Sequence, residues 1–78
     1  MPDDFDAKVL GRYADMVESF HADTDLGTTD RAQVVHLLRS VSKGHYMTRG
    51  RAVVRVDELA RDVSRKALLR TLEIIRNI

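Results

Sequence analysis

The stretch that decides the fold is "VDELARDVSRKALLRTLEIIRNI", residues 56–78 at the end of the 78-residue chain. At about 100° per residue its apolar side chains form one stripe, so a single amphipathic helix is one interpretation. The centre of the stripe rotates near Val63 and Ser64, in the sense opposite to the drift that a left-handed coiled coil absorbs. This rotation favours a break, which would divide the helical segment at about 57–78 into two helices.

From Ser64 onward the pattern predicts a helix with one broad apolar face. Ser64 is a residue type that favours the N-cap position. The inward face comprises Ala67, Leu68, Leu72, Ile74, Ile75 and Ile78, with Thr71 near its middle. The outward face then carries Arg65, Lys66, Leu69, Arg70, Glu73 and Arg76. The second helix would therefore present a mainly basic surface.

Two further helices are predicted upstream from apolar residues at helical spacing. The first spans about 4–21, and its apolar face is Phe5, Val9, Tyr13, Met16, Val17 and Phe20. The second spans about 30–43, with Val34, Leu37, Leu38 and Val41 directed inward. A polar loop with Gly27 separates these helices, and Lys43-Gly44 is a typical helix end.

The β-branched run at 52–56, "AVVRV", predicts at most one short strand. A strand needs a partner, so this one would either pair across a dimer or remain merely extended. The expected fold is thus all-α: a single domain, residues 1–78, with three or four helices. A domain this small buries a modest core, so self-association would help its stability.

The composition restricts where such a protein would work. The chain has no cysteine, which removes disulfide scaffolds and fits a reducing interior. Its N-terminus, "MPDDFDAKVL", is acidic where a targeting segment needs a basic start, and no apolar run is long enough to cross a bilayer. A soluble, cytoplasmic protein without membrane contact is expected.

The charges are distributed unevenly along the chain. Residues 1–30 carry a net charge of −6 and residues 31–78 carry +7. Separation of this kind raises the question of nucleic-acid binding. It is equally explained by internal complementarity, in which an acidic helix lies against basic ones.

The C-terminal half resembles the helix-turn-helix superfamily of DNA-binding proteins, including its winged-helix relatives. The resembling residues are Asp57 as a helix cap, Leu59 and Ala60 where the first helix packs, and Ser64-Arg65 opening the second. A helix at about 30–43 followed by "VVRV" is similar to the lead-in of a winged helix. The resemblance covers about residues 29–78, with a shortened turn and no wing.

This resemblance implies a set of DNA-contacting residues. Arg65, Lys66, Leu69 and Arg70 would enter a major groove, where arginine and lysine contact guanine and leucine contacts a thymine methyl. Lys43, Arg49, Arg51 and Arg55 would contact phosphates. The alternative for all of these cations is a solvated or internally paired face, and Arg51 and Arg55 would equally protect an exposed strand edge.

Other site chemistry has little support in the sequence. Asp23 and Asp25 have the opening spacing of a calcium loop, but Gly27 is misplaced and Val34 stands where a bidentate glutamate is needed. Capping and solvation explain these acids instead. The three histidines lack the spacing of a zinc site, and no nucleophile with a base is visible. A non-enzyme without a cofactor is expected.

Two functional hypotheses follow. The first is a small, dimeric transcription regulator that reads duplex DNA through its basic C-terminal helix, with the acidic N-terminal helix as a core and dimerisation element. The second is a helical protein–protein interaction module, such as an adaptor, inhibitor or assembly subunit. Leu69, Tyr46 and Met47 would be its interface anchors. An unbroken helix through Ser64 would favour the second.

Overall fold

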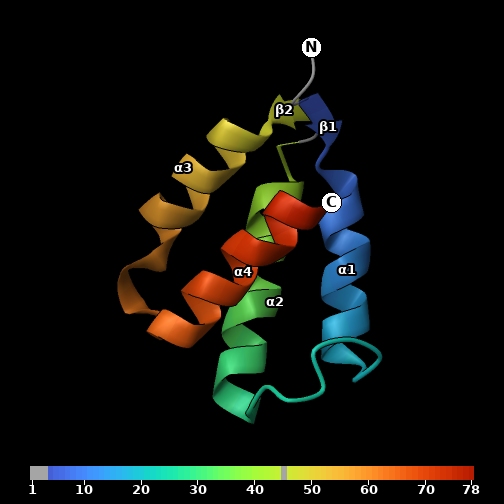
Figure 1. Ribbon diagram of the computed structural model, residues 1–78, viewed down its shortest axis with the longest axis vertical. Helices are drawn as coiled ribbons and strands as arrows, with labels where there is room; N and C mark the ends of the chain where they lie inside the picture. Colours follow the sequence, from blue (N-terminus) through green and yellow to red (C-terminus); the bar gives the residue numbers. More distant parts are fainter. Residues whose placement is uncertain (1–3, 45) are drawn as a thin grey trace.

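The computed structural model describes residues 4–44 and 46–78, and in these residues the all-α prediction is confirmed. Helices dominate, and one short two-stranded sheet joins the N-terminal segment to the middle of the chain (Figure 1). The elements are β1 (Asp4–Asp6), α1 (Lys8–Glu18), α2 (Thr28–Ser42), β2 (Tyr46–Thr48), α3 (Arg49–Leu59), the 3₁₀ turn η1 (Ala60–Asp62) and α4 (Arg65–Asn77).

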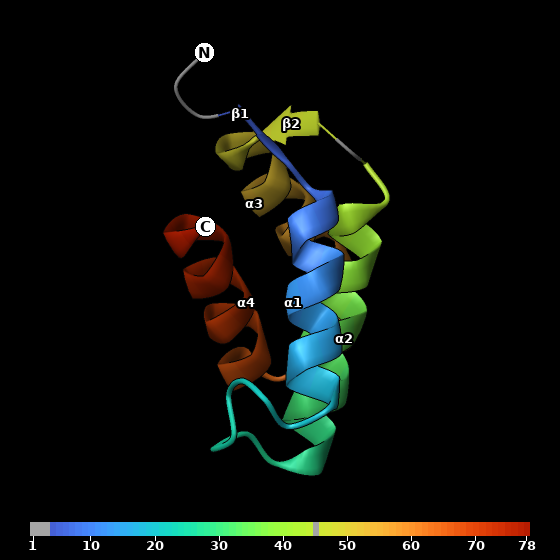
Figure 2. The same ribbon diagram turned by 90° about the vertical axis from the view of Figure 1, so that its right-hand side faces the viewer.

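The helices pack around a core centred on α2. Helices α1 and α2 run antiparallel side by side (Figures 1 and 2). Helix α4 crosses over α2, and α3 lies beside α4 (Figure 1). Strands β1 and β2 pair antiparallel at one end, with Phe5 opposite Met47. Helices therefore supply most of the core, and the sheet ties the N-terminal segment to the middle of the chain.

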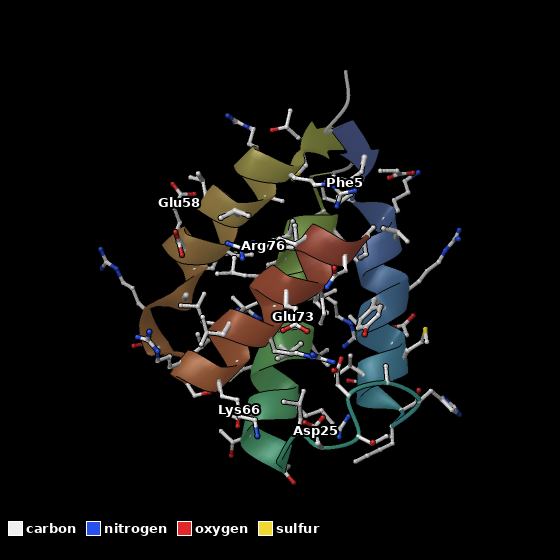
Figure 3. The ribbon with its side chains drawn as sticks, in the orientation of Figure 1. Phe5, Asp25, Glu58, Lys66, Glu73 and Arg76 are labelled. Atoms are coloured by element: carbon white, nitrogen blue, oxygen red, sulfur yellow. The ribbon has the colours of Figure 1, made fainter. Side chains whose placement is uncertain are left out.

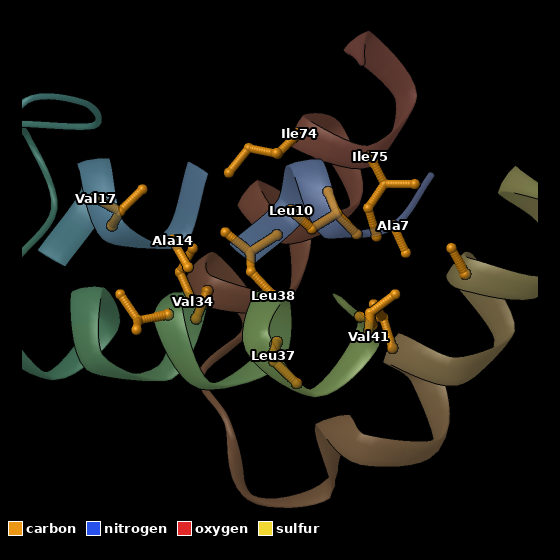
Figure 4. Close-up of a cluster of buried hydrophobic side chains, with 14 of the residues drawn as sticks. Ala7, Leu10, Ala14, Val17, Val34, Leu37, Leu38, Val41, Ile74 and Ile75 are labelled. Carbon is orange, nitrogen blue, oxygen red and sulfur yellow. The ribbon is translucent and has the colours of Figure 1, made fainter. Parts of the chain in front are cut away.

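Most of the largest fully buried side chains lie on α1, α2 and α4. Figure 4 shows Leu10 and Ala14 of α1 directed toward Val34 and Leu38 of α2. Val17, Leu37, Val41 and Ile75 are also buried there. Full burial of a side chain of this size contributes about 1.5–3 kcal/mol. The inward face predicted for α2 is thus confirmed.

The predicted break in the C-terminal segment is confirmed as well. The chain leaves α3 at Leu59, passes through η1 and an extended Val63, and enters α4 after Ser64. Ala67, Ile74 and Ile75 are buried as expected, and Leu68, Leu72 and Ile78 are partly buried. Thr71 is fully buried and donates its hydroxyl to the Ala67 carbonyl at 2.8 Å. This bond back to the preceding turn satisfies a polar group in the core.

The predicted strand at 52–56 is wrong, because these residues form the middle of α3. The hydroxyl of Thr48 accepts a hydrogen bond from the Arg51 amide at 3.1 Å and caps the helix N-terminus. Ala52 and Val56, four positions apart, are both fully buried. The burial of this helical face outweighs the β-propensity of the valines. Asp57 consequently lies inside α3 and caps no helix.

The first helix is shorter than predicted and is turned differently. Its first residues form β1, so α1 begins at Lys8 and ends at Glu18. Of the six residues expected to face inward, Val17 alone is buried, while Val9, Met16 and Phe20 are exposed. Phe5 and Tyr13 are partly buried.

The reason for this rotation is close helix packing. Small residues recur on the side of α1 that faces α2, where Ala7 and Ala14 are fully buried. A Cβ placed on Gly11 would lie 3.4 Å from the Ser42 hydroxyl, an ordinary van der Waals contact, so this side of α1 lies against the end of α2. The side with alanine and glycine therefore packs inward together with Leu10 and Val17. The bulkier side chains are left outside.

Candidate nucleic-acid interface

The turn of residues 60–64, called here the α3–α4 turn, is fixed by Ser64. Its hydroxyl oxygen accepts a hydrogen bond from the Ala67 amide at 3.1 Å, so the predicted N-cap is confirmed. The same hydroxyl donates to Asp30 at 2.5 Å, and the Ser64 amide donates to the Gln33 side chain at 2.8 Å. The start of α4 is therefore anchored to the N-terminal part of α2.

One face of α4 is exposed along its whole length. Arg65, Lys66 and Leu69 lie at its start, and Leu69 retains 52% of its exposure. Glu73 and Arg76 continue the same face toward the C-terminus (Figure 3). The structure thus brings three of the four predicted groove-contacting residues together. Glu73 places one carboxylate among the cations.

Arg70, the fourth residue predicted to contact bases, lies in an internal ion pair instead. Its guanidinium is paired with the Asp23 carboxylate, whose side chain is fully buried, and with Glu73 at 2.7 Å. The hydrogen bond from Arg70 to Asp23 raises the pKa of the arginine above its ordinary value. Arg70 therefore fastens α4 to the loop of residues 19–27, called here the α1–α2 loop.

Arg49, predicted to contact phosphate, also has internal partners. It donates to the backbone carbonyl oxygens of Ile75, at 2.6 Å, and of Ile78. Its guanidinium carbon lies 5.4 Å from the centre of the Phe5 ring. Carbonyl groups at the end of a helix lack partners within the helix, and a cation there is favourable. Arg49 thus acts as a cap for the end of α4.

The remaining predicted phosphate contacts line a groove between α2 and α3. Lys43, Arg51 and Arg55 surround a hollow of about 560 Å³ together with Met47 and Val54. This groove lies toward the C-terminal end of α2, whereas Ser64 is anchored at the N-terminal end. A helix of 15 residues is about 22 Å long. Arg55 also pairs with Glu58 at 3.6 Å. The exposed cations therefore form two separate groups.

Some acidic side chains of residues 1–30 form ion pairs with arginines of residues 31–78. Arg39 of α2 pairs with both Asp15 and Glu18 of α1, each at 2.9 Å. The hydrogen bond from Arg39 lowers the pKa of Glu18 below its ordinary value. Together with the pair between Arg70 and Asp23, this contact is a case of the internal complementarity considered above.

The structure corrects the interpretation of Asp23 as a solvated loop acid. Tyr13 donates its hydroxyl to the Asp23 carboxylate at 3.2 Å, on the opposite side from Arg70. Burial and the neighbouring Asp23 raise the pKa of the Tyr13 hydroxyl. Within residues 4–44 and 46–78, no cluster of three or more His, Cys, Asp or Glu side chains has a metal-binding arrangement.

Arg31 is the structural residue that sequence reasoning missed. It is buried and donates to four backbone carbonyls, those of Val17, Ala22, Asp23 and Leu26. Its guanidinium also lies 4.0 Å from the centre of the Phe20 ring. A cation near a helix N-terminus is unfavourable with respect to the helix dipole. That conflict was the one available signal of another role.

No family model matches the chain, and neither the curated proteins nor the solved structures include a significant match to it. In the described part of the chain, no helix has the length and apolar character needed to cross a membrane.

Proposed function

We propose that this chain is a small DNA-binding regulator that presents the N-terminal part of α4 to duplex DNA. The observation that supports the proposal is the break at Val63 and Ser64, which opens a separate helix with Arg65, Lys66 and Leu69 exposed together. The first residues of a recognition helix are those that reach base edges in helix-turn-helix proteins. The proposed role is binding without catalysis, in the cytoplasm and as a dimer.

Each exposed residue of this surface has a chemical role in the proposal. Arg65 and Lys66 donate to guanine or to phosphate oxygens, and Leu69 lies against a thymine methyl. Glu73 accepts from a cytosine amino group. Arg70 and Ser64 contribute indirectly, since their contacts with Asp23, Asp30 and Gln33 hold α4 in a fixed orientation.

Lys43, Arg51 and Arg55 enter the proposal as flanking phosphate contacts. They lie toward the C-terminal end of α2, about 15–20 Å along that helix from Asp30 and Gln33, to which Ser64 is bonded. A separation of this size lets them reach the backbone beside the contacted groove, where contacts set position and carry no sequence information. Arg49 is left out of the proposed surface because its guanidinium caps α4.

The proposal is tested by titrating a labelled duplex of random sequence with the protein at several salt concentrations. Affinity should fall linearly on a logarithmic scale, because phosphate contacts release counterions. In Arg65→Ala, Lys66→Ala the affinity should fall strongly, and the salt slope should decrease by about 2 if both side chains contact phosphate.

The matched control is Ala32→Glu, His36→Glu, which lowers the net charge by the same amount on the exposed side of α2. Circular dichroism should give the same helical content for both variants and the parent chain. An equal loss of affinity in the two variants would mean that only net charge matters. Absence of binding by the folded parent chain at low salt would end the proposal.

A second candidate is a protein–protein interaction module. Leu69 and Val54 are more than half exposed, at 52% and 57%, and Val54 and the partly buried Met47 line the groove between α2 and α3. The side chain of Tyr46, the other predicted anchor, lies outside the described part of the structure. Exposed apolar side chains beside arginines are typical of interface centres. Co-purification of a partner through this groove, without DNA affinity, would favour this function.

A further inference from the structure

Helix α1 has a second apolar strip that the described elements leave partly exposed. Val9 and Met16 keep 37% and 45% of their exposure, and Tyr13 between them is partly exposed. The three residues, called here the α1 stripe, are spaced four and three positions apart along the helix. Figure 2 shows α1 on the side of the molecule turned toward the viewer, with α4 and α2 behind its two edges.

The spacing of the α1 stripe is that of a helix seam. Apolar residues repeating at three and four positions form the contact line between two paired helices. An adjacent face of α1 already packs on α2 through Leu10, Ala14 and Val17. The α1 stripe is therefore separate from the apolar face of α1 that is buried in the core.

The charges along α1 indicate what covers the stripe. The exposed cations Lys8 and Arg12 lie in the first half of α1, and the acids Asp15 and Glu18 lie in the second half. Asp15 and Glu18 bond to Arg39, yet their side chains remain 72% and 60% exposed. Their oxygens thus remain accessible to a second cation.

This arrangement is complementary to itself in one orientation. A parallel pair of α1 helices would place the two basic halves side by side at one end and the two acidic halves at the other, which is unfavourable. In an antiparallel pair, the basic half of one helix lies against the acidic half of the other. Placing Val9 opposite the partner's Met16 also brings Arg12 near the partner's Asp15. A two-fold axis of this kind makes the same patch contact itself.

We propose that a second copy of this chain packs antiparallel on the α1 stripe, with the two-fold axis near Arg12 and Tyr13. The inference names a dimer surface and does not depend on DNA binding by α4. A helix of 11 residues is about 16 Å long, so the contact is smaller than the roughly 1,200–2,000 Å² of a standard interface. The dimer should therefore have a low affinity, and its population should rise as the protein concentration increases.

Cysteine cross-linking tests the orientation cleanly, because the chain has no cysteine of its own. Val9→Cys and Met16→Cys proteins of different mass are mixed and oxidised, and the products are separated without reductant. The antiparallel dimer gives the mixed disulfide between the two variants, since a disulfide needs Cα atoms about 4.4–6.8 Å apart. A parallel dimer gives the two self-disulfides instead and overturns the proposal.

Leu69→Cys is the control for random collision, because Leu69 on α4 is similarly exposed, at 52%. Its disulfide with either α1 variant should form much more slowly than the mixed α1 disulfide. Equal rates for all pairs would overturn the proposal.

Sedimentation equilibrium gives an independent measurement of the same surface. Met16→Asp should raise the dimer dissociation constant by at least about tenfold, which corresponds to 1.4 kcal/mol or more. Val54→Asp, an equivalent change at the 57% exposed Val54 of α3, should leave the constant unchanged. A parent chain that is monomeric up to about 1 mM, or an equal effect of the two changes, would overturn the proposal. Neither measurement contains DNA, so its failure leaves the proposed role of α4 untouched.

Discussion

The α3–α4 turn and the α1–α2 loop, which each connect two consecutive helices, are stabilised in different ways. The α3–α4 turn is held mainly by Ser64, through its cap on α4 and its bonds to Asp30 and Gln33. The α1–α2 loop is held by Arg31, which lies beyond the loop and donates to carbonyls at four positions on and beside it. One connection therefore combines a local cap with two bonds to a distant helix. In the other, one buried side chain of the next helix makes four of the bonds to the backbone.

The backbone of the two connections differs accordingly. Phe20 and Asp23 in the α1–α2 loop have φ angles of 64° and 53°, a left-handed conformation that costs a bulky residue such as phenylalanine free energy. No residue of the α3–α4 turn has a positive φ. Strained residues persist where surrounding contacts compensate them. The comparison indicates that Arg31 compensates for the strain of the loop.

The largest effect is expected from removing Arg31. Arg31→Ala should lower the free energy of unfolding by about 3 kcal/mol, because buried carbonyl groups lose their donor. A domain of this size has a total stability of about 4–12 kcal/mol, so the loss is a large fraction. Urea denaturation followed by circular dichroism measures it.

Arg39→Ala is the matched control for this change, since it removes an arginine from the same helix that is exposed and bonded to exposed acids. Its effect should be small, because exposed ion pairs contribute little. Equal destabilisation by the two changes would mean that the bonds of Arg31 to the α1–α2 loop have no special role in stability. Arg31→Lys should restore only part of the stability, because an ammonium lacks the planar fork of donors.

A smaller effect is expected at the α3–α4 turn. Ser64→Ala removes the N-cap and should cost about 1 kcal/mol, within the usual range for this substitution. The measurement is again urea denaturation. Ser19→Ala deletes an exposed hydroxyl that bonds locally to the Asp15 carbonyl, and it should cost much less. If Ser64→Ala did not change the free energy of unfolding, the Ser64 hydroxyl would not be what holds the α3–α4 turn.

This contrast also explains which parts of the fold could be predicted from the sequence. The start of α4 was predictable, because the cap at Ser64 and the following apolar face are signals within a few residues of each other. The inward face of α2 was predictable for the same reason. The helix at 52–56 was not, since the cap at Thr48 and the burial of Ala52 and Val56 compete with a β-branched composition.

The candidate site could be predicted only in part. The exposure of Arg65, Lys66 and Leu69 followed from the periodicity of α4. The internal partners of Arg70 and Arg49 did not, because Asp23 and the end of α4 meet these residues through tertiary packing. The outward turn of Val9 and Met16 was also hidden, since the choice between two apolar faces of α1 depends on which face packs on α2, and that is decided by tertiary packing.

The smallest expected effect tests whether the α1–α2 loop is joined to α1 and α4 through Asp23. Burial and the Asp23 carboxylate raise the pKa of Tyr13 above its ordinary value of 10.0. Because the folded state favours the neutral phenol, this contribution to stability is present below pH 10 and is lost as the pH rises through the higher folded-state pKa. A Tyr46→Phe protein leaves Tyr13 as the sole tyrosine, so phenolate absorbance reports its titration alone.

Adding Asp23→Asn to the Tyr46→Phe protein removes the negative charge that faces the Tyr13 hydroxyl at 3.2 Å. The pKa of Tyr13 should then fall toward its ordinary value, because ionisation no longer opposes a neighbouring anion. Glu73→Gln is the matched control, since Glu73 raises the same pKa through the smallest of its causes. A Tyr13 pKa unaffected by Asp23→Asn would mean that the loop does not hold this carboxylate against α1. The anchoring of the α1–α2 loop would then depend on Arg31 alone, without the contact through Asp23 to α4.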